Sequence, residues 1–197
     1  MFTPPYWNHS NIKFPDEEID LVLSEYKSTV PFVVDNYTSF YPEGSKPEKI
    51  WLNNYAAIIA DIMLNLGLET TTRYEYHLWS QLYLKGNNHF PHHHFHPVPG
   101  SSDNSAISFV HFIKPTDETT FRFLNLKGDE VIPPKQKEGD IILFPSWVWH
   151  TAVPNTTNEE RLIVAGNINI TYTDKNIDFY KKTYPKYFAD MQVSPIH

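Results

Sequence analysis

Residues 72–84, TRYEYHLWSQLYL, decide the fold, because over this stretch apolar and polar side chains alternate with a period of two. Alternate positions of a strand share a face. The two faces carry different sets of side chains: Trp79, Gln81 and Tyr83 on one, and Leu78, Leu82 and Leu84 on the other. Before Gly67 the apolar residues recur with a helical period instead. The sequence therefore predicts a change from helix to sheet near residue 70.

Two helices are expected before this strand. The first starts at Pro15, which is followed by three acidic residues that suit a first helical turn. Its apolar positions are Ile19, Val22, Leu23 and Tyr26. The second helix has one apolar face and is ended by Gly67; this face consists of Leu52, Tyr55, Ala56, Ile59, Ile62, Met63 and Leu66.

Further strands are expected after residue 84, with turn signals of Pro, Gly, Asn or Asp between them. They fall at residues 106–113, 119–126, 140–144, 150–153 and 161–171. Short strands without alternating helices indicate an antiparallel sandwich or barrel. We expect the segment from Lys175 to be irregular or briefly helical and to cover one sheet.

Length and composition narrow the class of protein. The 197 residues predict a single domain, with a helical part at about 1–68, a β-barrel core at about 70–172 and a C-terminal extension at about 173–197. The net charge of −7 argues against nucleic-acid binding, and the absence of cysteine excludes disulfides and thiolate ligands. We see neither a signal peptide nor a membrane span, so we expect a soluble, cytoplasmic protein. The oligomeric state cannot be predicted.

Histidines indicate a metal site. Five of the ten lie in the run NHFPHHHFHP, at positions 89, 92, 93, 94 and 96. In an extended segment His92, His94 and His96 face one way and His93 the other, so two of the three could bind one ion. A distant histidine, His150, ends the run GDIILFPSWVWH and could join them in an antiparallel fold. The alternative is that the cluster is a solvated loop.

Three segments resemble the iron(II)- and 2-oxoglutarate-dependent oxygenases of the prolyl-hydroxylase type. Residues 83–94, YLKGNNHFPHHH, resemble their Tyr-x-x-Gly-x-x-Tyr/His-x-x-His-x-Asp stretch. Residues 139–150 resemble the segment that ends in the distal iron ligand, and residues 160–167, ERLIVAGN, resemble the strand that carries the co-substrate arginine. The chain is most similar to a bacterial and phage group of this superfamily, over about residues 79–167.

This resemblance implies a double-stranded β-helix, a jelly-roll-like barrel, and a dioxygenase that uses Fe(II), 2-oxoglutarate and O2, most simply as a hydroxylase. It implies His92, His94 and His150 as iron ligands and Arg161 as the partner of the far carboxylate of 2-oxoglutarate. Gln81, Tyr83 and Asn167 are further candidates for co-substrate binding; the alternative for Gln81 and Tyr83 is packing inside the barrel. The substrate would be a small molecule or a peptide.

The chain also departs from the superfamily pattern. His94 stands where an Asp or Glu ligand is common, and Ile163 stands where the Arg-x-Ser pair has serine. The His-Pro sequence at 96–97 favours His94 and His96 as the pair instead, and Asp103 is a nearby acid that could close the triad. A three-histidine dioxygenase of the cupin type that does not use 2-oxoglutarate therefore remains an alternative, as does a non-catalytic jelly-roll protein with a structural zinc.

Two single substitutions test the register of the histidines. If His92 and His94 form the pair, His92→Ala should abolish stoichiometric metal binding, because two imidazoles alone make a poor site, while His96→Ala should have a small effect. The metal content after equilibrium dialysis measures both. The opposite pattern would favour the pair His94 and His96, and His94→Ala should be severe in either case.

Overall fold

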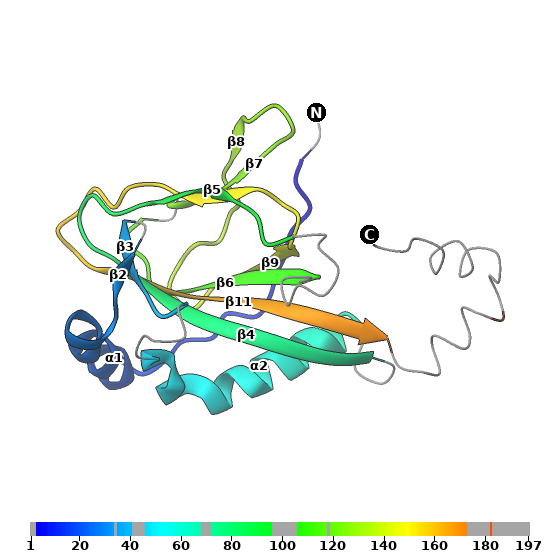
Figure 1. The fold of residues 1–197 in the computed structure, drawn as a ribbon, viewed down its shortest axis with the longest axis horizontal. Coiled ribbons are helices and arrows are strands. Elements are labelled where there is room, and N and C mark those ends of the chain that lie inside the picture. Colours follow the sequence, from blue (N-terminus) through cyan, green and yellow to red (C-terminus); the bar gives the residue numbers. More distant parts are fainter. Residues whose placement is uncertain are drawn as a thin grey trace, which may run out of the picture.

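The computed structural model describes residues 3–33, 35–40, 46–67, 72–95, 106–117, 119–172 and 182. In this part of the chain the strands form two antiparallel sheets, one above the other in Figure 1. The large sheet has the order β1-β9-β6-β11-β4-β3-β2, and the small sheet has the order β5-β10-β7-β8. The protein is therefore mainly β, as the sequence predicted.

The strands lie at β1 Trp7–Asn8, β2 Phe32–Val33, β3 Asn36–Thr38, β4 Thr72–Tyr83, β5 His89–His92, β6 Ile107–Lys114, β7 Phe121–Leu124, β8 Glu130–Val131, β9 Ile141–Pro145, β10 His150–Ala152 and β11 Arg161–Tyr172. The helices are α1 Asp16–Thr29 and α2 Leu52–Asn65, and a 3-10 turn, Pro47–Trp51, leads into α2. From β4 onward the chain passes repeatedly between the two sheets, which is the arrangement of a double-stranded β-helix.

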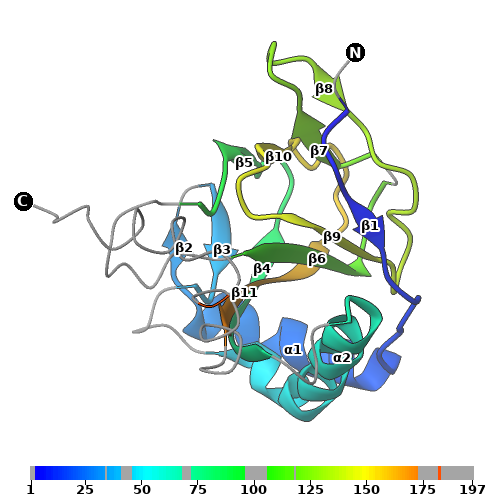
Figure 2. The same ribbon diagram turned by 90° about the vertical axis from the view of Figure 1, so that its right-hand side faces the viewer.

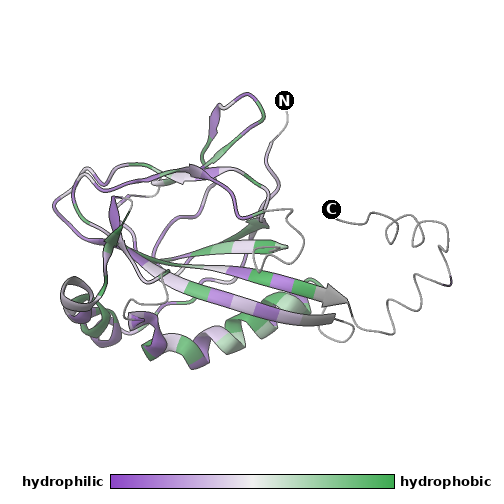
Figure 3. Cartoon of the chain, in the orientation of Figure 1, coloured by the Kyte–Doolittle hydropathy of each residue, from purple (hydrophilic) through white to green (hydrophobic). Residues whose placement is uncertain are grey.

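The longest pairing in the molecule joins β11 to β4, from Arg161 opposite Tyr83 to Tyr172 opposite Thr72. On its other side β11 pairs with β6, and β6 pairs with β9. Figure 3 shows hydrophobic and hydrophilic residues alternating along β4 and β11. The alternation seen in the sequence thus places different sets of side chains on the two faces of the large sheet.

Each face of the large sheet covers its own hydrophobic cluster. One face packs on α1 and α2, which lie together below the sheet in Figures 1 and 2. This cluster includes Leu78, Leu82, Leu162, Val164, Tyr55 and Ile59. The other face meets the small sheet, and its cluster includes Tyr83, Val110, Phe112, Phe121, Phe123, Phe144 and Ile163. The pocket described below lies on this second side.

Gly166 leaves room on β11 for side chains from the two neighbouring strands, β6 and β4. A Cβ atom at this position would lie 2.5 Å from the ring of Phe109 and 2.8 Å from Leu78. Both side chains are buried, so neither can move away easily. Glycine is therefore required here for packing.

The predicted helical part contains α1 and α2, but it also contains β1, β2 and β3. Pro15 is the N-cap of α1 rather than its first residue. The expected burial of Leu52 and Ala56 was wrong: both side chains are exposed, whereas Ile58 is buried. The predicted C-terminal extension lies outside the described residues except for Lys182. Within the described ranges we find no helix that is both long enough and apolar enough to cross a bilayer.

His111 on β6 is a buried histidine whose two ring nitrogens both have partners. Its Nε2 donates to the carbonyl of Ile12 at 2.7 Å, and its Nδ1 accepts from the hydroxyl of Tyr55 at 2.8 Å. These partners fit the neutral ring. Burial lowers the pKa of His111 to about 4. This geometry indicates that His111 has a structural role, with its ring on the side of the sheet that faces the helices.

His111 should make the fold sensitive to acid. In the unfolded chain its pKa returns to 6.5, so below this pH the unfolded state takes up a proton that the folded state refuses. Stability is then complete above pH 6.5 and decreases as the pH falls toward 4, by about 3 kcal/mol at about 1.4 kcal/mol per pKa unit. His111→Gln should flatten this part of the stability profile, measured by urea unfolding, whereas His77→Gln at an exposed position should leave it unchanged. An unaltered slope in His111→Gln would refute the assignment.

Candidate metal centre

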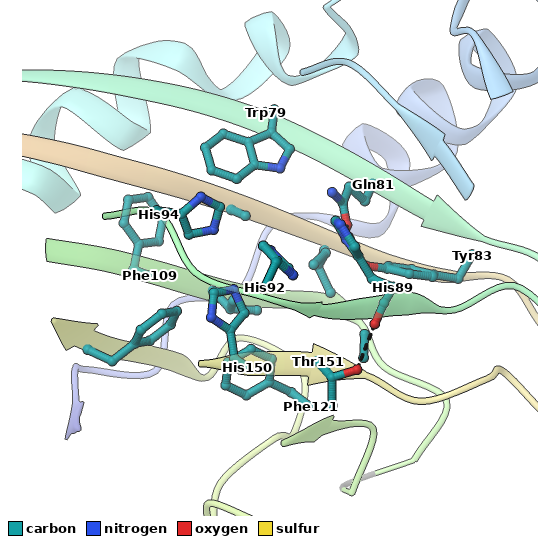
Figure 4. Close-up of a pocket in the computed structure, with 15 residues that line it drawn as sticks. Trp79, Gln81, Tyr83, His89, His92, His94, Phe109, Phe121, His150 and Thr151 are labelled. Carbon is teal, nitrogen blue, oxygen red and sulfur yellow. Dashed lines mark hydrogen bonds between the residues drawn. The ribbon is translucent and has the colours of Figure 1, made fainter. Parts of the chain in front are cut away.

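Three histidines from separate parts of the small sheet come together at its inner side. His92 ends β5, His94 follows two residues later, and His150 begins β10. His150 pairs directly with His92 across the two strands. One ring nitrogen from each of the three lies within 4.8 Å of the others. Figure 4 shows the three rings grouped below Trp79. This spacing suits the binding of one metal ion by three imidazoles.

The ring orientations of two of these histidines are fixed by the backbone. The Nδ1 of His92 lies 2.8 Å from the carbonyl oxygen of Phe90, and the Nδ1 of His150 lies 3.0 Å from that of Val148. A carbonyl only accepts, so each Nδ1 carries the proton and each Nε2 keeps its lone pair. Metal-binding histidines use this arrangement. The donor set therefore fits a metal ion.

The protonation of the site also suits metal binding. Burial lowers the pKa of His150 well below its ordinary value, and the neighbouring histidines lower it further. Burial likewise lowers the pKa of His92, against the opposing effect of its hydrogen bond to Phe90. Imidazole binds metal in its neutral form. Both rings are therefore ready to act as ligands near neutral pH.

His94 lies beyond the end of β5, and a backbone hydrogen bond rather than strand pairing positions it. Its backbone N–H donates to the carbonyl oxygen of Ser146 at 2.8 Å, which ties the segment after β5 to the end of β9. Its ring lies 5.0 Å from that of His92 and 5.1 Å from that of His150, centroid to centroid. His96 and Asp103, the two alternatives to this triad, lie outside the described residues.

His89 is part of the site, although we assigned it no role from its sequence context. Its ring stacks on that of His92, with a centroid distance of 4.2 Å and an interplanar angle of 16°. Its Nδ1 lies 3.2 Å from Oε1 of Gln81, and its backbone oxygen accepts from Thr151. Burial, and then the neighbouring His92, lower the pKa of His89 to about 3. His89 thus orients the ring of His92, a proposed metal ligand, and connects it to Gln81 on β4.

Gln81 and Tyr83 on β4 line the inner hollow beside the histidines, as Figure 4 shows. The Tyr83 hydroxyl donates to Oε1 of Gln81, the same atom that His89 contacts. Burial raises the pKa of the Tyr83 hydroxyl, so it stays protonated and remains a donor. Asn167 does not line this hollow: its Oδ1 accepts from Ser108 at 2.8 Å.

Arg161, the first residue of β11, is almost completely buried. Its guanidinium carbon lies 4.2 Å from the centre of the Tyr83 ring, and Nη2 donates to the carbonyl oxygen of Val153 at 2.9 Å. Nη1 is buried and has no hydrogen-bond partner among the described residues. Burial lowers the pKa of Arg161, which still remains charged. A buried guanidinium with an unused donor is suited to a carboxylate ligand.

The space around the triad has two parts. The inner hollow measures about 30 Å³ and is lined mostly by apolar rings and aliphatic side chains, among them Phe109, Phe121, Phe144 and Ile163. The outer hollow measures about 230 Å³ and lies between the histidines and strands β2 and β3. Asn36, Thr38 and Phe40 contribute to its wall. The proposed metal ligands stand at the boundary of the two.

Three large side chains on or near strands β7 and β10 lie outside the inner hollow. Arg122 forms an ion pair with Glu130. Trp147 and Trp149 precede His150 in the chain and are half exposed, and the ring of Trp149 contacts that of His93.

Comparisons with known proteins agree with this geometry. The family model described as "Putative 2OG-Fe(II) oxygenase" matches residues 77–167. No curated protein matches the chain. Among solved structures, a Pseudomonas putida prolyl-4-hydroxylase has a TM-score of 0.57 at 18% identity, over 85% of this chain and 93% of that one.

Two further solved structures are similar. The non-haem α-ketoglutarate-dependent epimerase SnoN from nogalamycin biosynthesis has a TM-score of 0.60 at 18% identity, over 88% of this chain and 82% of that one. A Trichoplax adhaerens prolyl hydroxylase, solved with a peptide fragment of hypoxia inducible factor, has a TM-score of 0.53 at 12% identity, over 87% and 84%. At these identities the likeness establishes the fold, a double-stranded β-helix.

The triad predicts about one metal ion per chain. His150→Ala should lose tight binding of iron(II), because the remaining two imidazoles no longer surround the ion. His93→Ala is the matched control, since His93 lies between the proposed ligands but is not one of the three. Metal analysis after anaerobic dialysis measures both variants. Full metal content in His150→Ala would remove His150 from the site.

Proposed function

We propose that this chain is an iron(II)- and 2-oxoglutarate-dependent oxygenase, which the family model over residues 77–167 and the shared fold support, and that its own residues serve that chemistry as follows. His92, His94 and His150 hold the iron, and Arg161 binds the far carboxylate of 2-oxoglutarate. One observation carries this proposal: the buried Nη1 of Arg161 has no hydrogen-bond partner among the described residues. Arg161 lies on the same side of the large sheet as the three histidines, whose ring nitrogens are close enough together to bind one metal ion. With iron bound, the site would supply an oxidation in which 2-oxoglutarate, O2 and a substrate C–H group give succinate, CO2 and C–OH, with one oxygen atom of O2 entering succinate and the other entering the substrate.

The protein supplies binding and orientation. Three protein ligands leave room on the metal for the 2-oxo and adjacent carboxylate groups of 2-oxoglutarate and for one further ligand. Arg161 offers Nη1 to the other end of the co-substrate as a charge-assisted donor. Tyr83, which lies against the guanidinium, offers its hydroxyl as a further donor. Asn167, bonded to Ser108 away from the inner hollow, has the weakest claim among the residues proposed from sequence.

Entry of 2-oxoglutarate requires side chains to move. An inner hollow of about 30 Å³ accepts a ligand of the size of water rather than a five-carbon dicarboxylate. Gln81 and His89 fill the space between Tyr83 and the triad, and they are held there by two hydrogen bonds to one oxygen atom. Breaking these bonds frees both the hydroxyl of Tyr83 and the amide of Gln81 for the co-substrate.

Aromatic side chains keep water away from the reaction. Phe121 and Phe144 lie with their ring centres 5.5 Å and 4.8 Å from that of His150. Both side chains are buried. A dry site strengthens the attraction between the guanidinium and a carboxylate.

The substrate enters from the outer hollow, which lies between the histidines and strands β2 and β3. Its wall combines aromatic rings with the polar side chains Asn36 and Thr38, which suits a small molecule or one side chain of a peptide. We expect no nucleic-acid partner, given the net charge of −7. A cytoplasmic location stays a prediction.

Substitution of Arg161 tests the use of 2-oxoglutarate. Arg161→Ala should leave iron binding intact but weaken 2-oxoglutarate binding by about two to four orders of magnitude, since removing one partner of a buried charge pair costs about 3–5 kcal/mol. Arg161→Lys should be intermediate, because a point charge cannot replace the planar fork. The measurement is 2-oxoglutarate titration of the anaerobic iron(II) protein, followed by its metal-to-ligand charge-transfer band.

Arg122→Ala is the matched control, because Arg122 forms a surface ion pair with Glu130 and should bind 2-oxoglutarate like the wild type. Thermal unfolding checks that each variant is folded. A wild-type protein that binds iron but shows neither the band nor succinate formation would favour the three-histidine dioxygenase. A site that admits zinc but no further ligand would favour the structural alternative.

A further inference from the structure

Asn155 is a buried polar residue in the turn that joins β10 to β11. It is 1% exposed, although several of its neighbours in the turn are exposed. A buried side-chain amide is costly unless hydrogen bonds satisfy it. β10 carries the proposed ligand His150, and β11 begins with Arg161. The turn around Asn155 therefore connects the metal side of the proposed site with its cation.

The amide nitrogen of Asn155 joins the end of one strand to the start of another. Its Nδ2 donates to the carbonyl oxygen of Tyr83 at 3.1 Å and to that of Glu159 at 2.7 Å. Tyr83 is the last residue of β4, and Glu159 lies two residues before Arg161. One side chain thus ties β4 to the segment that leads into β11.

The amide oxygen fixes the orientation of this side chain. Oδ1 of Asn155 accepts from the backbone N–H and the hydroxyl of Thr157, at 3.2 Å and 2.9 Å, and from the hydroxyl of Thr116 at 3.3 Å. A carbonyl oxygen only accepts and a backbone N–H only donates, so the nitrogen must face Tyr83 and Glu159. The amide therefore has one orientation, with partners at both of its ends.

The contacts of Arg161 lie in the segments that Asn155 joins. The guanidinium packs 4.2 Å from the centre of the Tyr83 ring, and Nη2 donates to the carbonyl oxygen of Val153. Val153 lies two residues before Asn155 in the same turn. A shift of this turn relative to β4 would move Val153 against Tyr83, and the guanidinium contacts both. The position of the buried Nη1 donor therefore depends on Asn155.

We propose that Asn155 is a positioning residue for 2-oxoglutarate, which holds Arg161 and Tyr83 where they can bind the far carboxylate. In the described structure Asn155 lines neither hollow, so it acts through Arg161 and not by touching the co-substrate. A donor that is fixed in advance lowers the cost of binding. This inference rests on the proposed function, because it requires Arg161 to be the partner of the carboxylate.

Asn155→Ala removes the amide but keeps the backbone hydrogen bonds of this residue with Gly86 and Asn87. We expect unchanged iron(II) binding and about ten-fold weaker 2-oxoglutarate binding, an effect of the size found for coupled neighbours. Anaerobic titration of the iron(II) protein, followed by its charge-transfer band, measures the affinity. 2-Oxobutyrate has the metal-binding end of 2-oxoglutarate but no far carboxylate, so it should bind both proteins equally. Equal weakening of both acids would indicate a general structural defect and overturn the inference.

A double variant separates action through Arg161 from an independent effect. In an Arg161→Ala background, Asn155→Ala should change the 2-oxoglutarate affinity by less than about two-fold, because the group that it positions is gone. A further loss of about ten-fold in the double variant would show that Asn155 acts by another route, which contradicts the inference.

Asn125→Ala is the matched control. Oδ1 of Asn125 also accepts from the backbone N–H two residues further on, that of Lys127 at 2.8 Å, but this turn joins β7 to β8. The variant should bind both acids like the wild type. If it weakens 2-oxoglutarate binding as much as Asn155→Ala does, Asn155 has no special role.

Thr157→Val decides the inference if thermal unfolding shows that Asn155→Ala does not fold. It removes the 2.9 Å hydrogen bond to Oδ1 of Asn155 and leaves the amide itself in place. The loss of one hydrogen bond should weaken 2-oxoglutarate binding by about five-fold and leave 2-oxobutyrate binding unchanged. Wild-type affinity for 2-oxoglutarate in a folded Thr157→Val protein would then overturn the inference.

Arg161→Ala distinguishes failure of the inference from failure of the proposed function. If this variant binds 2-oxoglutarate like the wild type, the proposed function and the inference are both wrong. If Arg161→Ala binds 2-oxoglutarate weakly but a folded Asn155→Ala binds it normally, the inference alone is wrong.

Discussion

The pairing of β11 with β4 is the constraint on which the rest of the structure depends. Along this pair, alternate side chains reach either the helices or the space between the sheets, so one register sets both the core and the pocket. A slip by one residue would exchange the faces of Arg161 and Leu162. The guanidinium would then lie among the aliphatic side chains that pack against α2, on the side of the sheet away from the three histidines. The packing of aliphatic side chains between the large sheet and the helices therefore fixes the side of the sheet that Arg161 faces.

Local patterns predicted the parts of the fold that are long and regular. The alternation from residue 72 assigned Gln81 and Tyr83 to one face and Leu82 to the other, and the structure agrees. The i, i+2 spacing of His92 and His94 likewise places two rings on one side, although the second lies beyond the end of β5. Such features depend only on the geometry of one segment, so they can be predicted from the sequence.

Features that depend on a partner strand could not be predicted in the same way. Strands β1, β2 and β8 contain two residues each, too few for any period, and they exist because a neighbouring strand pairs with them. The role of His89 depends on Gln81, which approaches it from β4 and fixes its ring. The unpaired Nη1 donor of Arg161 could not be predicted either, because recognising it requires knowing which groups surround the guanidinium.

The two short strands at the rims of the large sheet also protect the protein against self-association. β1 pairs with β9, whose sequence IILFP is almost wholly apolar, and β2 forms the opposite rim. An uncovered strand of this kind is a template for pairing with another copy of the chain. Trp7 and Asn8 pair with it, and the backbone N–H of His9 donates to Ile141. A deletion that removes this arm would uncover β9 and turn the molecule toward aggregation, and it would also take away Tyr6, which stacks on Phe123.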